Sequence, residues 1–190
     1  MAMPLLLASA SPRRKEILTL LDIPFEVCPA VRESAPAGLP PAERVQALAR
    51  CKAEEVAAAH PNRLVVGADT MVVLDGRALG KPRDEAHALE MLTALQGRRH
   101  TVRTGVTLRQ GDKSLTQSEA TDVCFRSASE SELLAYIATG EPMDKAGAYG
   151  VQGKGALLVE RLEGDFFNVM GLPVLRLSRM LEYFGISLLS

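Results

Sequence analysis

The first residues that could do chemistry follow a short apolar run near the start of the chain. There Ser9-Ala10-Ser11-Pro12-Arg13-Arg14-Lys15 has the pattern of a helix start, because Ser11 suits the N-cap and Pro12 the first helical position. Three cations then fall in the first turn, where the helix dipole is already positive and each costs an isolated helix about 0.3–1 kcal/mol. A docked phosphate would reverse that cost. The pattern therefore predicts an anion site with Arg13 and Arg14; a solvated basic patch is the alternative.

Lys52 occupies a position where packing favours an apolar residue. It shares one face of a predicted helix with Val45, Leu48 and Val56. An ammonium group that is buried without a partner is costly. Two interpretations stay open: the lysine extends its charged head to solvent, or it faces a pocket that supplies negative charge.

Asp69 interrupts a run over residues 64–74 that is otherwise almost wholly apolar. An ionised carboxylate in a dry core needs a cation, a metal or hydrogen bonds, and aspartate disfavours strands. We therefore expect two β segments, Leu64–Ala68 and Met71–Leu74, separated by a bend or bulge that turns Asp69 toward a cleft. A plain turn with a local hydrogen bond is the alternative.

Two further polar residues stand in predicted loops. Lys81, in Gly80-Lys81-Pro82, could contact a phosphate or simply be solvated. Gln152 lies in a glycine-rich stretch over 145–155, and its amide offers both a donor and an acceptor to the edge of a base. The stretch lacks the spacing of a P-loop. Several cations beside one or two carboxylates fit a polyphosphate with a bridging divalent ion.

Alternating strand and helix patterns must position these residues. The helical patterns span 12–21, 41–60, 84–95, 129–139 and 173–184. Ser129 with Glu132 predicts a capping box at the start of the fourth helix. The strand patterns span 5–7, 25–27, 64–68, 71–74, 101–108, 118–125 and 156–162. Crossover helices combined with a hairpin turn at Asp75-Gly76 predict an α/β fold with a mixed parallel and antiparallel sheet.

Length and composition limit the classes of protein that fit. A chain of 190 residues, 47% of them apolar, favours one compact domain over residues 1–190. The 22 basic and 23 acidic residues nearly cancel and only 4% of residues are aromatic, which argues against nucleic acid as a partner. Three widely spaced cysteines favour reduced thiols, and no apolar run reaches membrane-spanning length. We expect a soluble, cytoplasmic protein that does not bind membranes.

Four motifs occur in order: Ala8-Ser9-Ala10-Ser11-Pro12-Arg13-Arg14, Gly67-Ala68-Asp69-Thr70, Gly80-Lys81-Pro82 and Asp144-Lys145-Ala146-Gly147-Ala148-Tyr149-Gly150-Val151-Gln152-Gly153. With them the chain resembles the Maf family of nucleoside triphosphate pyrophosphatases, over nearly its whole length. The resemblance implies a single domain over 1–190 with an elongated mixed β-sheet flanked by helices, of the inosine-triphosphatase-like kind. It also implies a homodimer.

The resemblance further implies hydrolysis between the α and β phosphates, with release of a nucleoside monophosphate and pyrophosphate. It makes Asp69 the proton acceptor. The polar phosphate and metal positions of the family match Ser9, Arg13, Glu33, Lys52 and Lys81. The trio of the branch that prefers dTTP and UTP matches Arg13, Thr70 and Gln152.

A mechanism consistent with the residues and the resemblance uses a divalent cation, Mg²⁺ or Mn²⁺, held by Asp69 and Glu33. Asp69 takes a proton from the water that attacks the α-phosphorus, and Arg13, Lys52 and Lys81 offset the charge of the departing pyrophosphate.

Three other functions stay open. The chain could hydrolyse modified or non-canonical nucleotides, with dTTP and UTP as incidental substrates. It could be a regulator, for example of cell division, that binds nucleotides without catalysis. It could also bind phosphate or a phosphosugar at Ser11–Lys15 alone, but that leaves Lys52, Asp69 and Gln152 unexplained.

Overall fold

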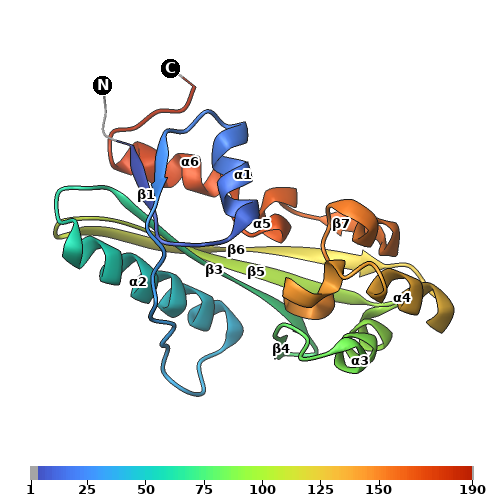
Figure 1. The fold of residues 1–190 in the computed structure, drawn as a ribbon. Helices are drawn as coiled ribbons and strands as arrows, with labels where there is room; N and C mark the ends of the chain where they lie inside the picture. The colour runs from blue at the N-terminus through green and yellow to red at the C-terminus, as the bar shows by residue number, and fades with distance from the viewer. Residues whose placement is uncertain (1–3, 190) are drawn as a thin grey trace. The chain divides into compact units, whose positions relative to one another are not determined.

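The computed structural model describes residues 4–189; residues 1–3 and 190, which the expected domain includes, lie outside the described residues. Within them, seven strands pair in the order β2-β1-β3-β5-β6-β7, with β4 on β3 (Figure 1). The strands are β1 (Leu5–Leu7), β2 (Phe25–Val27), β3 (Val65–Leu74), β4 (Arg77–Leu79), β5 (Arg99–Gln110), β6 (Lys113–Phe125) and β7 (Val159–Glu163). Strand β1 pairs parallel with β2 and β3, whereas β3–β4 and β6–β7 are antiparallel. The predicted α/β class with a mixed sheet is confirmed.

The ends of the five predicted helices lie within about two residues of the observed ends. They are α1 (Pro12–Leu20), α2 (Pro41–Ala59), α3 (Glu85–Leu95), α4 (Glu130–Ile137), α5 (Phe166–Met170) and α6 (Val174–Tyr183), with 3-10 turns η1 (Glu141–Asp144), η2 (Ala146–Ala148) and η3 (Gly153–Leu158). Helix α5 was not predicted. The strand expected over 156–162 begins only at Val159, because the preceding residues form η3. No helix among residues 4–189 has both the length and the apolar character needed to cross a membrane.

The described residues divide into two compact units. The first contains 4–69, 104–119 and 171–189, and the second contains 70–103 and 120–170. Three of the boundaries fall within β3, β5 and β6, and the fourth follows α5. The expectation of a single domain over 1–190 stays a prediction.

In the first unit, α2 packs backbone-to-backbone on the sheet at two glycines. A Cβ atom on Gly67 of β3 would lie 2.3 Å from the Ala49 carbonyl oxygen, and one on Gly105 of β5 would lie 2.3 Å from the Val45 carbonyl oxygen. Such distances leave no room for any side chain, so both strands need glycine there. This close approach fixes the side chains of α2 against β3.

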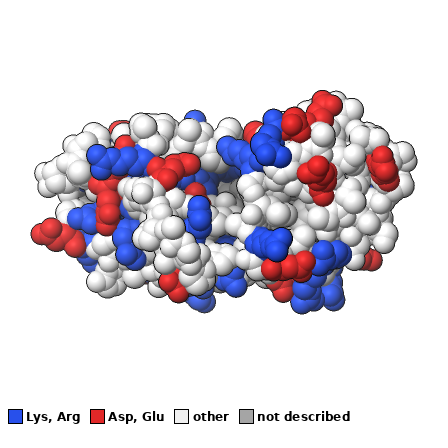
Figure 2. All heavy atoms as spheres, turned by 90° about the horizontal axis from the view of Figure 1, so that it is seen from below, with Lys and Arg blue, Asp and Glu red and all other residues white. Residues whose placement is uncertain are grey.

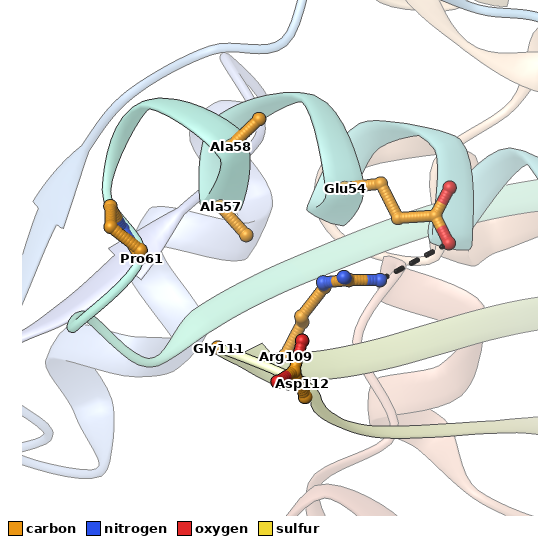
Figure 3. A pocket seen from close by; sticks show the side chains of 7 residues that line it. All are labelled: Glu54, Ala57, Ala58, Pro61, Arg109, Gly111 and Asp112. Carbon is orange, nitrogen blue, oxygen red and sulfur yellow. Dashed lines mark hydrogen bonds and ion pairs between the residues drawn. The ribbon is translucent and has the colours of Figure 1, made fainter.

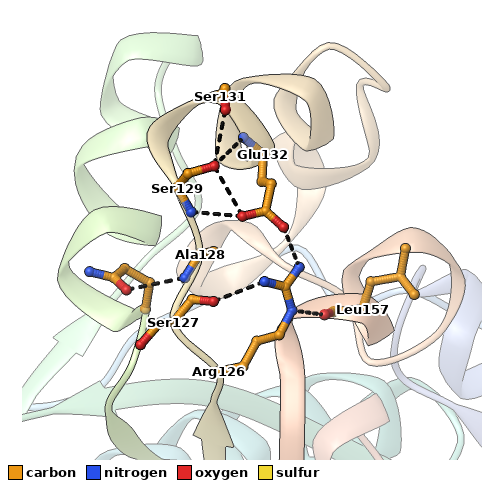
Figure 4. A network of polar contacts seen from close by, with 8 residues as sticks. Arg126, Ser127, Ala128, Ser129, Ser131, Glu132 and Leu157 are labelled. Atoms are coloured by element: carbon orange, nitrogen blue, oxygen red, sulfur yellow. Dashed lines mark hydrogen bonds and ion pairs between the residues drawn. The ribbon is translucent and has the colours of Figure 1, made fainter.

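In the second unit, helix α4 begins with the cap that the sequence predicts. The Ser129 hydroxyl accepts from the Glu132 N–H, and the Glu132 carboxylate accepts from the Ser129 N–H at 2.8 Å (Figure 4). The Arg126 guanidinium donates to the same carboxylate at 2.8 Å. The Ser129 N–H, then Arg126 and the Ser129 hydroxyl, lower the pKa of Glu132 to about 2. The predicted capping box at the start of α4 is confirmed.

Candidate active site

Lys52 is the centre of a charged cluster in the first unit. Its side chain is 9% exposed, and its Nζ lies 2.8 Å from Glu33 Oε1. The same Nζ donates to Asp69 Oδ1 at 2.9 Å. Of the two interpretations of this lysine, the one with a partner of negative charge is correct. The buried ammonium group is held between the half-buried Asp69 carboxylate and the exposed Glu33 carboxylate.

Asp69 lies within an unbroken strand, so the expected break between two β segments is wrong. Strand β3 runs continuously from Val65 to Leu74. Alternate residues of a strand point to the same face, so Gly67 and Asp69 both face α2. Because Gly67 lets α2 approach closely, Lys52 reaches the carboxylate and supplies the cation that it needs. A bulge is therefore not required to take Asp69, whose side chain is 16% exposed, out of the core.

Arg14 and Ser9 form a second part of the cluster. The buried Arg14 donates from Nε to the Gly171 carbonyl at 2.8 Å and from Nη1 to Ser9 Oγ at 2.9 Å. Burial lowers the pKa of Arg14 to about 10, although the negative charges of Asp69 and Glu33 oppose this. The guanidinium is therefore still charged at neutral pH. It is a cation fixed by the protein, rather than a mobile one on the surface.

The turn before α1 differs from the expected helix cap. Ser11 stands at the N-cap, but its side chain makes no capping hydrogen bond. Its N–H instead donates to Ser9 Oγ at 3.3 Å. The prediction of a Ser11 cap is wrong, because the Ser9 hydroxyl is the acceptor that orders this turn. Arg13 is half-buried in the same turn, and the predicted anion site there stays a prediction.

Glu33 is positioned by a residue that the sequence reasoning missed. Glu55, on α2, accepts from the Val31 N–H at 3.1 Å and from the Arg32 N–H at 2.8 Å, one bond to each carboxylate oxygen. The bonds from Arg32 and then Val31 lower the pKa of Glu55. Glu55 thus ties the loop to α2 immediately before Glu33. Glu33 itself contacts Lys52, which lies on the same helix as Glu55. The sequence did carry one signal for Glu55: its spacing of three residues from Lys52 places both side chains on one face of the helix.

Three predicted substrate residues belong to the second unit. Thr70 follows Asp69 in β3 and is half-buried, Lys81 is exposed in the loop after β4, and Gln152 is half-buried directly before η3. The Gly147 N–H donates to the Gly80 carbonyl at 3.0 Å. The loop of Lys81 and the glycine-rich stretch of Gln152 therefore contact each other within this unit.

A cavity in the first unit does not coincide with the charged cluster. It has a volume of about 400 Å³ and lies beside the C-terminal part of α2 and the β5–β6 turn (Figure 3). Its lining residues are Glu54, Ala57, Ala58, Pro61, Arg109, Gly111 and Asp112. None of these is a predicted site residue. We place the candidate site at the Lys52 cluster, where buried charge has to be explained.

The surface charges show no separation by sign on the face that Figure 2 draws. Basic and acidic side chains are interspersed there, as the counts of 22 basic and 23 acidic residues would suggest. The charge that distinguishes the candidate site is the buried charge of Lys52 and Arg14.

Glu33 and Asp69 are the candidate metal ligands. Among residues 4–189 no group of three or more His, Cys, Asp or Glu side chains could hold a metal ion. Mg²⁺, however, is commonly bound by one or two carboxylates together with substrate phosphates and water. Both carboxylates already face one cation, the Lys52 ammonium. The two carboxylates therefore fit a hard divalent cation whose remaining ligands are substrate phosphates and water.

Comparison with known proteins identifies the family. The model of the family described as "Maf-like protein" matches residues 4–184. A protein of Moorella thermoacetica named dTTP/UTP pyrophosphatase is 53% identical over 186 residues, covering 96% of this chain and 95% of the relative. A protein of Bacillus velezensis with the same name is 50% identical over 183 residues, covering 96% and 97%. A solved structure titled nucleoside-triphosphatase / dITP/XTP pyrophosphatase, from Mycobacterium abscessus, aligns over 96% of this chain and 98% of its own with a TM-score of 0.45 and 16% identity.

The family model and the two relatives named dTTP/UTP pyrophosphatase each match nearly the full length of this chain. These matches show that the chain belongs to the Maf family.

Proposed function

We propose that this chain hydrolyses nucleoside triphosphates, with dTTP and UTP preferred, to the nucleoside monophosphate and pyrophosphate. The relatives named dTTP/UTP pyrophosphatase support this activity, since about half of their residues are identical to this chain's. The structural observation that carries the proposal is the buried Lys52 ammonium between Asp69 and Glu33. A cation and two carboxylates in one place suit the binding and cleavage of a phosphoanhydride.

In this proposal Asp69 is the proton acceptor for the water that attacks the α-phosphorus. Lys52 orients the Asp69 carboxylate through the 2.9 Å bond to Oδ1. Lys52 and the fixed Arg14 provide positive charge that does not have to reorganise during the reaction. Phosphoryl transfer depends mainly on such positioning and electrostatic stabilisation. Ser9 contributes by holding Arg14.

Glu33 and Asp69 would hold a divalent cation, Mg²⁺ or Mn²⁺, together with the substrate phosphates. When bound, such an ion neutralises phosphate charge and lowers the pKa of a bound water. The remaining substrate contacts follow the resemblance: Arg13, Thr70, Lys81 and Gln152 bind the nucleotide. A homodimer and a cytoplasmic location stay predictions.

The test is a panel of triphosphates with products resolved by ion-exchange chromatography. With dTTP or UTP plus Mg²⁺ or Mn²⁺, we expect equal amounts of the monophosphate and pyrophosphate. A diphosphate with orthophosphate would contradict cleavage between the α and β phosphates. A higher kcat/KM for modified nucleotides would favour the non-canonical pyrophosphatase. Nucleotide binding with no product from any member would favour the non-catalytic regulator.

The Glu55→Gln variant tests how Glu33 is delivered to the cluster. The amide keeps one oxygen acceptor but replaces the other by a donor, which faces a backbone N–H. One of the two loop bonds is then lost, so Glu33 should be held less well beside Lys52. We expect kcat/KM with dTTP to fall about tenfold, the size of one hydrogen bond to a charged group. Pyrophosphate release is the measurement.

Glu54→Gln is the matched control for Glu55→Gln. Glu54 neighbours Glu55 on α2 but lines the cavity of Figure 3 and pairs weakly with Arg109 at 3.5 Å. The kcat/KM of the Glu54→Gln variant with dTTP should match that of the parent chain. Equal losses in the two variants would show a general effect of charge on α2, and would contradict the positioning role.

A further inference from the structure

Tyr136, on α4, holds the glycine-rich stretch on the N-terminal side of Gln152. The Gly150 N–H donates to Tyr136 Oη at 3.1 Å, two residues before Gln152. The Tyr136 hydroxyl in turn donates to Glu141 Oε1 at 2.9 Å. The phenol thus acts both as an acceptor and as a donor. The backbone before Gln152 is thus attached to the second unit through one buried hydroxyl.

Glu141, in η1, holds the same stretch on the C-terminal side of Gln152. Its Oε2 accepts from the Lys154 N–H at 3.0 Å, and its Oε1 accepts from the Gly155 N–H at 3.1 Å. Because Oε1 also accepts from Tyr136, the two anchors are joined through one carboxylate oxygen. We name the pair Tyr136 and Glu141, with these three backbone bonds, the Tyr–Glu clamp.

Two glycines shape the backbone around the clamp. A Cβ atom on Gly153, whose φ is +71°, would lie 2.7 Å from Glu141 Oε2. A Cβ atom on Gly155 would lie 2.5 Å from Tyr136 Oη and 2.2 Å from the Gly150 carbonyl oxygen. The stretch can therefore close on the clamp only with glycine at these positions. The close fit explains the density of glycines better than flexibility does.

The protonation states make the clamp strong. Burial raises the pKa of Tyr136, so its hydroxyl keeps its proton. Burial alone would raise the pKa of Glu141, but the bonds from Gly155, Lys154 and Tyr136 outweigh this and lower it. A neutral hydroxyl and two N–H groups thus donate to an ionised carboxylate. Such charge-assisted bonds are about twice as strong as neutral ones.

Next to the clamp, the same stretch is anchored by a buried aromatic contact. His100 Nε2 lies 2.7 Å from the hydroxyl of Tyr149, the residue before Gly150. Both rings also contact Phe125 edge-on, with centroids 5.0 Å and 4.7 Å away. Residues on both sides of Gln152 are therefore fixed, while Gln152 itself is half-buried and precedes η3.

We infer that the Tyr–Glu clamp fixes Gln152 in the position from which it reads the base, so that Tyr136 and Glu141 are positioning residues for base choice. The inference rests on the proposed function, in which Gln152 contacts the nucleotide. An amide discriminates between bases only when its donor and acceptor are held in one orientation. Preorganised backbone on both sides of Gln152 lowers the entropy cost of holding the amide in that orientation on binding. The contribution of the clamp should then appear in selectivity, beyond any effect on hydrolysis in general.

The experiment compares Tyr136→Phe and Glu141→Gln with the parent chain on dTTP, UTP, dCTP and dATP. We expect the ratio of kcat/KM for dTTP to that for dCTP to fall about tenfold in each variant, as when one hydrogen bond to a base is weakened. The change should arise mainly in KM for dTTP. In a Gln152→Ala background the same substitutions should leave the ratio unchanged, because residues that act through one another are not additive.

Tyr183→Phe and Glu160→Gln are the matched controls, since both residues are exposed and lie outside the clamp. Their ratios should equal the parent's. A lower melting temperature with an unchanged ratio in the clamp variants would overturn the inference, as would an equal loss with all four nucleotides. A further fall of the ratio in the Gln152→Ala background would also overturn it. Failure of the parent chain to release pyrophosphate from any nucleotide would instead contradict the proposed function, and base choice by the clamp with it.

Discussion

Asp69→Asn should reduce kcat with dTTP by about 10²–10⁴-fold, the usual contribution of a general base. The amide has nearly the same shape as the carboxylate, but it cannot take the proton of the attacking water. It still offers an oxygen to Lys52, which also keeps Glu33 at 2.8 Å. The fold should therefore persist, with a melting temperature close to that of the parent. Steady-state pyrophosphate release and a thermal melt on the same preparation measure both quantities.

Asp112→Asn is a control for the loss of one carboxylate from this unit. Asp112 is exposed in the β5–β6 turn and lies outside the Lys52 cluster. Its turnover should equal that of the parent chain. Turnover of Asp69→Asn within tenfold of the parent would remove Asp69 from the role of proton acceptor. A folded but inactive Asp69→Asn beside an active Asp112→Asn would support that role.

The elements of the fold were predictable where local signals were strong. Pro12 and Pro41 at helix starts, the Ser129 capping box and the Asp75-Gly76 turn each depend on neighbouring residues alone. Their physical causes lie within a few positions of the chain, so they can be read without the fold. The short α5 and the 3-10 turn η3 were missed, because segments of five or six residues carry no clear period.

The candidate site was only partly predictable, because its contacts join distant residues. The sequence showed that Lys52 and Asp69 stand where packing favours apolar residues, and a partner of opposite charge was one of two interpretations for each, since a buried charge is costly. It did not show that they were each other's partners, because that depends on how closely α2 approaches β3. The close approach comes from the absent side chains of Gly67 and Gly105. The pattern of apolar residues in α2 does not indicate that two strands lack a Cβ atom where the helix packs on them.

The contact of Glu55 with the loop before Glu33 was also not predictable from the sequence. The Glu55 carboxylate bonds to backbone N–H groups, which every residue of the loop before Glu33 except proline possesses. No choice of side chain in that loop therefore marks the contact. A motif does not show which backbone groups such a side chain binds, and this applies equally to Glu141 in the second unit.

Lys52→Met should lose both activity and stability, which separates it from Asp69→Asn. Methionine fits the apolar stripe of α2, but it leaves Asp69 and Glu33 without the cation that they share. A charged group left buried without its partner costs about 1–3 kcal/mol or more. Loss of one fixed charge at the reacting phosphates should lower kcat by about 10²-fold. Urea unfolding and pyrophosphate release measure the two effects.

The double variant Lys52→Met/Asp69→Asn identifies the source of that instability. If it is the uncompensated carboxylate, the neutral amide should restore most of the free energy of unfolding while activity stays lost. The coupling between the two substitutions would then be favourable and measurable as a double-mutant cycle. Stability that falls further in the double variant would mean that Lys52 acts through its packing against β3. In that case the charge of Asp69 would be balanced elsewhere in the cluster, where Arg14 is a fixed cation that interacts with it.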